Sequence, residues 1–398
     1  MADLNAATTT GATKRPILIV AAEASGDTLG AALMRRLREQ ASHDLRFVGI
    51  GGTQMRSEGL DSIVPMESLA VMGVFDALRA YPHVRRAVVA VTELAVRENP
   101  SAAVLIDSWG LTIRIADFLR VHQPDLPLIK YVGPQVWAHR AGRAGKIAER
   151  FDVLLSTNLL DLPYYKGLKL RVDFVGNPAL NSDLSQASAD RCRARICAEQ
   201  SQPILLLAPG SRAGEIDRMS GPLGEATALL SARAPRLIPV VLAAAPVAAR
   251  VRAAVAAWPV TARIVESEED KADAMIAATA AIACSGTVAT ELALANCPMA
   301  VGYRIGPLTY AVLKPMFKLK YFTLFNIAAD KEVAPEFLQT GCTGAALAGA
   351  VLPFLEQPLV RAKQIQAQAD ALTKLGPRGV DPAEAAARAV LETIATRP

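Results

Sequence analysis

One arrangement constrains the fold of this chain more than any other: an apolar strand that runs into small residues and then into a helix. It is clearest at residues 204–218, ILLLAPGSRAGEIDR, where Gly210 follows a short apolar run and Glu215 lies in the first helical turn. Such a run predicts a strand covered on both faces. Ser211 is the expected N-cap, and backbone N–H groups, the helix dipole and Arg212 would face a phosphate-like anion. A plain turn and cap is the alternative interpretation.

The same arrangement occurs in the first part of the chain. Residues 17–20, ILIV, run into AAEASGD, which contains Glu23, and a helical pattern follows over residues 28–40. Another apolar strand is expected at residues 104–107, with Asp107 at its carboxyl end. Open parallel sheets bind their ligands at that end, so we expect Glu23 and Asp107 to be candidate catalytic residues.

A third copy lies at residues 280–295. The apolar run 280–284 is followed by Ser285, Gly286 and Thr287, and the helix expected next carries Glu291. The N–H groups of Gly286 and Thr287 would hold a diphosphate while Glu291 accepts hydrogen bonds from ribose hydroxyls. The alternative for Glu291 is a solvated helical side chain.

Strands that alternate with helices in this way predict an α/β fold with two Rossmann-like domains and a cleft between them. A length of 398 residues also exceeds what a single core usually supports. We expect five regions: a disordered leader at 1–15, an acceptor- and lipid-binding domain at 16–182, a linker at 183–202, a nucleotide-sugar domain at 203–356, and helices at 357–398 that return to the first domain.

Composition excludes several classes of protein. Hydrophobic residues make up 52% of the chain, yet no uninterrupted apolar stretch is long enough for a membrane-spanning helix. The polar N-terminus lacks the apolar core of a signal peptide, which predicts a cytoplasmic protein. A net charge of +5 without a dense basic arm argues against nucleic acid and fits anionic small ligands or an anionic lipid surface. The five cysteines lack metal-ligand spacing, so we expect free thiols and no metal.

A helix expected within residues 68–91 has two interpretations. Val71, Val74, Phe75 and Leu78 share one helical face, next to Met72, and three arginines follow. The face would pack on the core or lie in a membrane interface, and periodicity does not separate the two.

Seven segments between residue 16 and about residue 355 resemble, in this order, the lipid-A-disaccharide synthase family. They are AAEASGD at 21–27, VGIGGTQM at 48–55, LAVMG at 69–73, LAPGSRAGEI at 207–216, CSGTVATEL at 284–292, CPMAVGYR at 297–304 and NIAADKEVAPEFLQ at 326–339.

This resemblance implies a GT-B glycosyltransferase fold and an inverting reaction that needs no metal or cofactor. Family enzymes transfer 2,3-diacylglucosamine from its UDP derivative to 2,3-diacylglucosamine 1-phosphate, forming a β-1,6 disaccharide and UDP at the cytoplasmic surface of the inner membrane. Arg212 and Asn326 match positions important for activity, and the segment from Ser285 to Glu291 matches nucleotide-binding residues. A homodimer is an open alternative to a monomer.

The chain departs from the family pattern near the expected cleft. The usual Asp-small-Pro-Asp-Phe reads Asp107-Ser108-Trp109-Gly110-Leu111, so the carboxylate usually proposed as general base is replaced by Gly110. The last Trp of Pro-Ser-Val-Trp-Ala-Trp is replaced by His139, and the His of Gly-His-Pro by Asn177. The Pro expected before Asn326 is Phe325.

Asp107 and His139 are therefore the candidate bases, and the position of Asp107 at a strand end favours it. Its alternative role is to cap the next helix, and that of His139 is a surface position. Two other functions stay open: a divergent paralogue that uses another acylated or nucleotide sugar, and a catalytically impaired protein that binds UDP-sugar or lipid.

Overall fold

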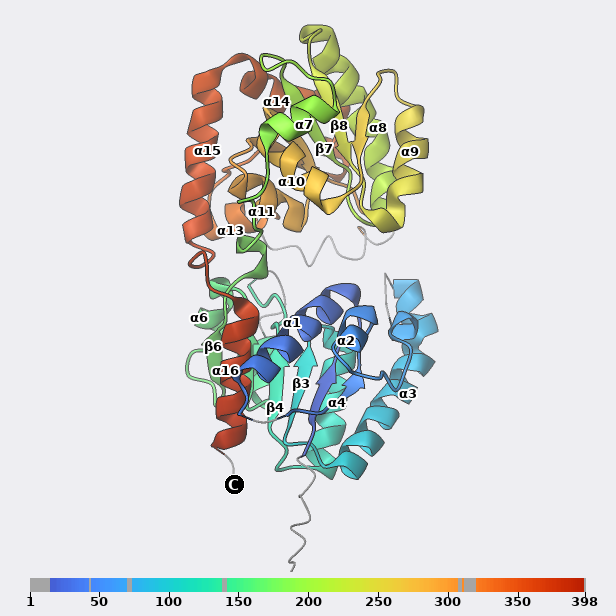
Figure 1. Ribbon diagram of the computed structural model, residues 1–398, viewed down its shortest axis with the longest axis vertical. Helices are drawn as coiled ribbons and strands as arrows, with labels where there is room; N and C mark the ends of the chain where they lie inside the picture. The colour runs from blue at the N-terminus through green and yellow to red at the C-terminus, as the bar shows by residue number, and fades with distance from the viewer. Residues whose placement is uncertain are drawn as a thin grey trace, which may run out of the picture.

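In the computed structural model the chain forms two α/β domains, each built on a six-stranded sheet in which all neighbouring strands are parallel (Figure 1). The structure describes residues 15–42, 44–69, 74–137, 142–306, 310 and 320–396, with the backbone alone for residue 67 and residues 74–81. Two Rossmann-like domains were expected from the sequence, and this prediction is confirmed.

The first domain has the strand order β2-β1-β3-β4-β5-β6. Its elements are β1 Ile17–Val20, α1 Ala24–Gln40, β2 Phe47–Ile50, α2 Thr53–Ser57, η1 Met66–Leu69, α3 Val74–Glu98, β3 Ala102–Ile106, α4 Trp109–His122, β4 Leu128–Tyr131, α5 Arg143–Ala148, β5 Val153–Ser156, η2 Leu159–Asp161, α6 Leu162–Tyr165, β6 Arg171–Phe174 and η3 Pro178–Leu180.

Alternation along β1 explains why its whole sequence is apolar. Leu18 and Val20 pack with α3 and α4 on one face of the sheet, whereas Ile17 and Ile19 pack with α1 and the C-terminal helix α16 on the other. All four side chains are fully buried. A strand covered on both faces has no position for a polar side chain, so the apolar run predicted its location correctly.

The second domain has the strand order β12-β11-β10-β7-β8-β9. Its elements are α7 Ala189–Arg195, β7 Ile204–Ala208, α8 Ala213–Arg233, β8 Ile238–Leu242, η4 Ala245–Val247, α9 Ala248–Ala256, β9 Arg263–Val265, α10 Glu268–Ala277, β10 Ala280–Cys284, α11 Thr287–Leu294, β11 Met299–Tyr303, α13 Leu324–Ala329, β12 Glu336–Leu338, η6 Gln339–Gly341, α14 Gly344–Glu356 and α15 Pro358–Thr373. The chain ends with α16 Pro382–Ala395, which packs on the first domain.

The same alternation places β7 in the middle of this domain. Leu205 and Leu207 pack against α8 and α14, and Ile204 and Leu206 face α10, α11 and α15. Of the four edge strands, β6 and β12 were not predicted from the sequence.

The last two helices belong to different domains, as Figure 1 shows. Helix α15 packs on α11, α13 and α14, and α16 lies along α1 of the first domain. An ion pair of 2.8 Å between Arg36 in α1 and Asp381, the N-cap of α16, helps to hold α16 against the first domain. The chain therefore connects the two domains twice, once before α7 and once between α15 and α16.

Candidate functional site

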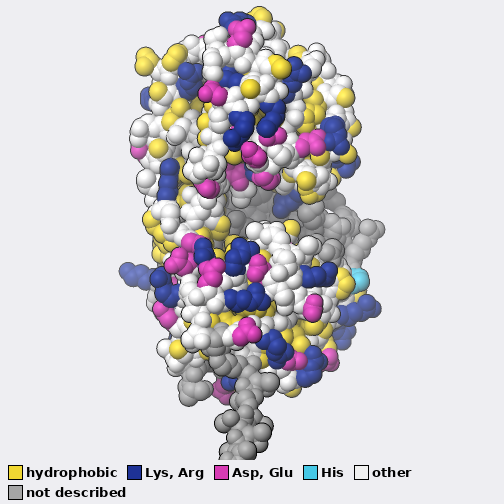
Figure 2. Space-filling view, viewed as in Figure 1, with side chains coloured by type: hydrophobic (Ala, Val, Ile, Leu, Met, Phe, Trp, Pro, Cys, Tyr) yellow, Lys and Arg dark blue, Asp and Glu magenta, His cyan; other side chains and the backbone are white. Residues whose placement is uncertain are grey.

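The ends of several strands meet around a cavity of about 440 Å³ between the domains, and the space-filling view is hollowed between them (Figure 2). Its lining comes mostly from the second domain, with Ser25 of α1 contributed by the first. The lining residues are Ser25, Ala208, Gly210, Ser211, Arg212, Glu215, Leu242, Ala243, Ala244, Val265, Glu266, Ser267, Glu268, Lys271, Cys284, Ser285, Gly286, Thr287, Val288 and Glu291.

The turn after β7 is organised by Glu215 and not by Ser211. Helix α8 begins at Ala213 with Arg212 at the N-cap position, so the prediction that Ser211 caps the helix is wrong. The Glu215 carboxylate accepts hydrogen bonds from the backbone N–H groups of Ser211 (3.0 Å) and Arg212 (3.2 Å). These N–H groups were expected to face an anion, but a carboxylate of the chain already occupies them.

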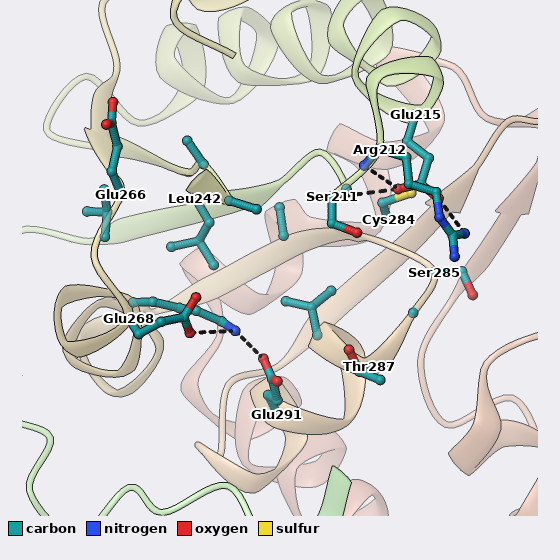
Figure 3. Close-up of a pocket in the computed structure, with 18 of the residues that line it drawn as sticks. Ser211, Arg212, Glu215, Leu242, Glu266, Glu268, Cys284, Ser285, Thr287 and Glu291 are labelled. Atoms are coloured by element: carbon teal, nitrogen blue, oxygen red, sulfur yellow. Dashed lines mark hydrogen bonds and ion pairs between the residues drawn. The ribbon is translucent and has the colours of Figure 1, made fainter. Parts of the chain in front are cut away.

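The Arg212 guanidinium supplies the positive charge of this turn. Its side chain is 56% exposed, whereas that of Glu215 is 9% exposed. The closest approach between the two side chains is 3.5 Å, from Arg212 Nη1 to Glu215 Oε1. Figure 3 shows the Arg212 side chain directed toward Ser285, and Arg212 lines the cavity, so its exposed guanidinium is available to a ligand there.

The turn after β10 provides backbone donors beside Arg212. Gly286 is extended (φ 166°) and precedes α11, whose first N–H groups have no acceptor within the helix. Ser285, Gly286 and Thr287 all line the cavity. Exposed N–H groups, the positive end of a helix dipole and a nearby guanidinium form an arrangement suited to a diphosphate.

Glu291 is paired with a lysine that the sequence analysis did not consider. Lys271 Nζ in α10 lies 3.0 Å from Glu291 Oε2 and 3.4 Å from Glu268 Oε2 (Figure 3 shows the two carboxylates). Burial opposes protonation of Lys271, but the two carboxylates outweigh this effect and raise its pKa. Glu291 is therefore not a freely solvated side chain, and a ribose hydroxyl would share it with Lys271.

Two carboxylates of the first domain lie opposite this wall. Glu23 is the N-cap residue of α1 and follows β1, and Asp107 follows the adjacent strand β3. Burial raises the pKa of Glu23, the Asp107 carboxylate raises it further, and Arg212 of the second domain opposes both. The structure thus brings Glu23 within electrostatic range of Asp107 on the adjacent strand and of Arg212 across the cleft.

Asp107 has an unusual backbone. Asp107 and Ser108 both have left-handed φ angles, 44° and 35°, a conformation that costs a non-glycine residue roughly 1–2 kcal/mol. The side chain is exposed. Ser108 is the N-cap residue of α4, with no side-chain capping bond, so the alternative that Asp107 caps this helix is wrong. Strained residues of this kind concentrate at functional sites.

Lys130 lies directly behind this turn and was also missed from the sequence. It is the third residue of β4 and is 1% exposed. Its ammonium group donates to the carbonyl oxygens of Leu105 (3.4 Å) and Asp107. A lysine inside a four-residue strand that is otherwise apolar or aromatic was the available signal.

Asn326 is not brought to the cavity. It is completely buried, its Oδ1 accepts from the N–H groups of Val333 (2.8 Å) and Ala334 (3.0 Å), and its Nδ2 donates to the Ala334 carbonyl (2.8 Å). All its polar atoms thus fix the segment before β12, and any effect on a ligand is indirect.

The remaining predicted site residues have no described side chains. Val71, Met72 and His139 lie outside the described residues. Val74, Phe75 and Leu78 lie on α3, where only the backbone is described.

Comparison with known proteins identifies a family and a fold. A family model described as lipid-A-disaccharide synthetase matches residues 17–390. A lipid-A-disaccharide synthase of Rhodospirillum centenum is 38% identical over 385 residues, covering 96% of each chain. One of Gluconobacter oxydans is 36% identical over 381 residues, covering 96% of this chain and 91% of the relative.

Solved structures with low sequence identity share the two-domain architecture. A Staphylococcus aureus MnaA–UDP co-structure has a TM-score of 0.61 at 12% identity and covers 97% of this chain and 99% of its own. MurG of Acinetobacter baumannii has a TM-score of 0.53 at 13% identity, with 95% and 99% covered. The fold is the GT-B arrangement of two Rossmann-like domains, as the resemblance implied.

Proposed function

The chain belongs to the lipid-A-disaccharide synthetase family, and we propose from this premise that it transfers 2,3-diacylglucosamine from its UDP derivative to 2,3-diacylglucosamine 1-phosphate. The products are a β-1,6 disaccharide and UDP. The observation that carries the proposal is the arrangement of Arg212 and the α11 N-terminus on one side of the cleft and the carboxylates Glu23 and Asp107 on the other. One wall suits a leaving diphosphate and the other suits proton removal.

The donor would bind in the 440 Å³ cavity, whose lining comes mostly from the second domain. Arg212 and the N–H groups of Gly286 and Thr287 contact the diphosphate in this proposal, and Glu291 with Lys271 contacts the ribose. Leu242 and Val265 supply apolar surface for the nucleobase of UDP. Several elements thus contribute polar groups to a largely apolar pocket, as is usual for nucleotide sites.

The reaction needs a base and a stabilised leaving group. The acceptor hydroxyl attacks the anomeric carbon, the bond to the UDP oxygen breaks, and a carboxylate takes the hydroxyl proton. We assign the role of this base to Asp107, which is exposed at the end of β3. The Arg212 guanidinium and the α11 dipole offset the negative charge that develops on UDP. Glu23, whose raised pKa suits proton transfer, is positioned beside them.

The decisive experiment measures UDP and disaccharide formed from the two acylated substrates. Asp107→Asn should lower kcat by roughly 10²–10⁴-fold, the usual contribution of a positioned base. Asp370→Asn, on the exposed side of α15, is the matched control and should retain activity. Full activity of Asp107→Asn would remove Asp107 from the mechanism.

Donor binding is tested separately. Arg212→Ala should weaken UDP binding by roughly 1.5–3 kcal/mol, the scale of one charge-assisted hydrogen bond, as measured by calorimetry. Arg233→Ala removes an arginine with a 68% exposed side chain at the other end of the same helix and should leave UDP affinity unchanged. Equal affinities of wild type and Arg212→Ala would contradict the donor site.

The substitution at Gly110 supports two alternative functions. Tight UDP binding without product from these substrates, but with product from another acylated acceptor or nucleotide sugar, would identify a divergent paralogue. Binding without turnover of any acylated acceptor would identify a UDP-sugar- or lipid-binding protein.

We also propose that α3 contacts the cytoplasmic surface of the inner membrane. Among the described residues, no helix is both long and apolar enough to cross a bilayer. Arg85, Arg86 and Val89 are exposed on one side of α3, while Val88 and Val91 are buried on the other. Basic residues beside apolar ones are typical of peripheral membrane contacts.

Vesicle flotation tests this contact. Val74→Glu combined with Phe75→Glu should lower binding to anionic vesicles by roughly tenfold, because two carboxylates would enter the interface. Val96→Glu, at a 54% exposed position near the other end of α3, is the control. Undiminished binding of the double variant would mean that this part of α3 packs on the protein.

A further inference from the structure

Lys130 is a charged residue in a place that usually excludes charge. It lies on β4, in the interior of the sheet between β3 and β5, and pairs in register with Leu105 of β3. The side chain is 1% exposed. Burying an ammonium group costs several kcal/mol unless hydrogen bonds and a counter-charge offset the loss of hydration.

The partners of Lys130 belong to the turn that carries Asp107. Nζ donates to the carbonyl oxygen of Leu105 and to that of Asp107, the residue directly before Ser108. The same turn receives a hydrogen bond from Thr112 Oγ1 to the Asp107 carbonyl (2.9 Å). The Asp107 N–H donates to the Tyr131 carbonyl, at 2.8 Å. Strand β4 therefore holds Asp107 through two consecutive residues, Lys130 and Tyr131.

This turn needs such support because it is strained. Two successive non-glycine residues with left-handed φ angles persist only where surrounding contacts fix them. Removal of the Lys130 ammonium would leave the Leu105 carbonyl without this donor. The Asp107 carbonyl would keep only the hydrogen bond from the Thr112 hydroxyl. The turn would then relax toward ordinary φ angles and redirect the Asp107 side chain.

The charge of Lys130 is coupled to the same residue. Burial lowers the pKa of Lys130 to about 7, and the Asp107 carboxylate opposes that fall. Near neutral pH a substantial fraction of Lys130 is therefore a cation, and its counter-charge is Asp107.

We propose that Lys130 is the positioning residue of Asp107: its ammonium group fixes the left-handed turn after β3 and provides the counter-charge for the carboxylate that faces the cleft. This inference rests on the proposed function, in which Asp107 is the base. Lys130 is buried and does not line the donor cavity, so in this proposal it acts on the proton-transfer step and not on donor binding.

Lys130→Met and Lys130→Gln test this role. Methionine keeps most of the apolar stem without donors, and glutamine keeps a donor without charge. We expect Lys130→Met to lower kcat by at least about tenfold while KM for the UDP-sugar changes less than about twofold. Lys130→Gln should recover part of kcat. The thermal midpoint of Lys130→Met, measured in parallel, has to lie above the assay temperature, so that a fall in kcat does not reflect unfolded protein.

A second measurement does not depend on turnover. Hydrogen exchange of backbone amides in residues 105–113 should be faster in Lys130→Met than in wild type, while residues 204–208 of the other sheet serve as the internal control. If the wild-type protein forms no UDP, the proposed function fails and the exchange experiment still decides the role of Lys130. Unchanged exchange with unchanged kcat would overturn the inference, as would losses of kcat and donor affinity that follow the unfolded fraction.

Discussion

Gly110 lies in the first turn of α4, three residues after Asp107, and its backbone leaves room for a side chain. A Cβ atom there would meet only Arg114 Nη1, at 3.7 Å. A carboxylate near a helix N-terminus is favoured by the helix dipole, and replacement of an exposed helical glycine adds roughly 0.5–1 kcal/mol of stability. The loss of the family carboxylate at this position is therefore reversible without steric cost.

We predict that Gly110→Asp folds at least as stably as wild type and raises kcat by about tenfold or more, because a positioned carboxylate base contributes roughly 10²–10⁴-fold. Product formation and chemical denaturation measure the two effects. Gly110→Asn matches the aspartate in size and lacks its charge. Equal kcat for the two variants would assign proton removal to Asp107 alone.

Two of the other three departures from the family pattern, Asn177 and Phe325, have structural roles, and the third, His139, lies outside the described residues. Asn177 is the N-cap residue of η3, and its Oδ1 accepts from the Ala179 N–H at 3.0 Å. Phe325 is fully buried in the core of the second domain. Asn177 thus caps a helix and Phe325 fills the core. Gly110, in contrast, is exposed.

At the scale of the element, the turn between β7 and α8 depends on Gly210. Its φ is +112°, and a Cβ atom would lie 2.4 Å from Glu215 Oε2. An alanine there would both strain the backbone and displace the carboxylate that caps the helix. We predict that Gly210→Ala lowers the free energy of unfolding by roughly 1–3 kcal/mol and weakens UDP binding.

Gly221→Ala is the control for this prediction. Gly221 lies within the same helix, and a Cβ atom there would meet nothing within 4 Å. Alanine should therefore stabilise the protein by roughly 0.5–1 kcal/mol and leave UDP affinity unchanged. Denaturation curves and calorimetry on both variants distinguish a local effect of the turn from a general effect of glycine replacement.

Sequence reasoning located the elements where burial dictates composition. The strands Ile17–Val20 and Ala280–Cys284 were predicted with their observed bounds, because strands covered on both faces are apolar throughout. The strand β6 was missed, because half of its sequence RVDF is polar and it is only partly buried at the edge of the sheet. Because β6 has one partner strand and all four of its residues are exposed or only partly buried, its pattern resembles that of a loop.

The sequence predicts which strand ends form the candidate site. It does not predict the roles of particular side chains, because they depend on contacts across the fold. Glu215 reaches back to the N–H groups of the turn, Asn326 turns inward to a segment seven residues later, and Lys130 reaches an adjacent strand. A pattern along the chain shows none of these directions.

At the scale of the whole molecule, the site is divided between two domains that the chain connects twice. Arg212 belongs to the second domain, and Glu23 and Asp107 to the first. The pKa of Glu23 depends on residues of both domains, because burial and Asp107 raise it and Arg212 of the second domain lowers it. A ligand that alters the field of Arg212 should therefore change the protonation of Glu23.

We predict that UDP binding is coupled to proton uptake by Glu23. The diphosphate would offset the charge of Arg212 and add negative charge nearby, so the pKa of Glu23 would rise further in the complex. A group whose pKa rises on binding takes up protons, and UDP affinity should therefore increase as pH falls through the interval between the free and bound pKa values. Calorimetry of UDP binding over a series of pH values, in buffers with different ionisation enthalpies, measures this uptake.

Titration of UDP itself also contributes to the measured protons, so the test is the difference between wild type and Glu23→Gln. The glutamine variant should bind UDP with less proton uptake and a flatter dependence on pH, because it retains size and hydrogen bonding without a titrating group. Glu39→Gln, at an exposed position of the same helix, should match wild type. Identical proton uptake in Glu23→Gln and wild type would show that UDP does not alter the field of Arg212 at Glu23, and the two walls of the cleft would then act independently.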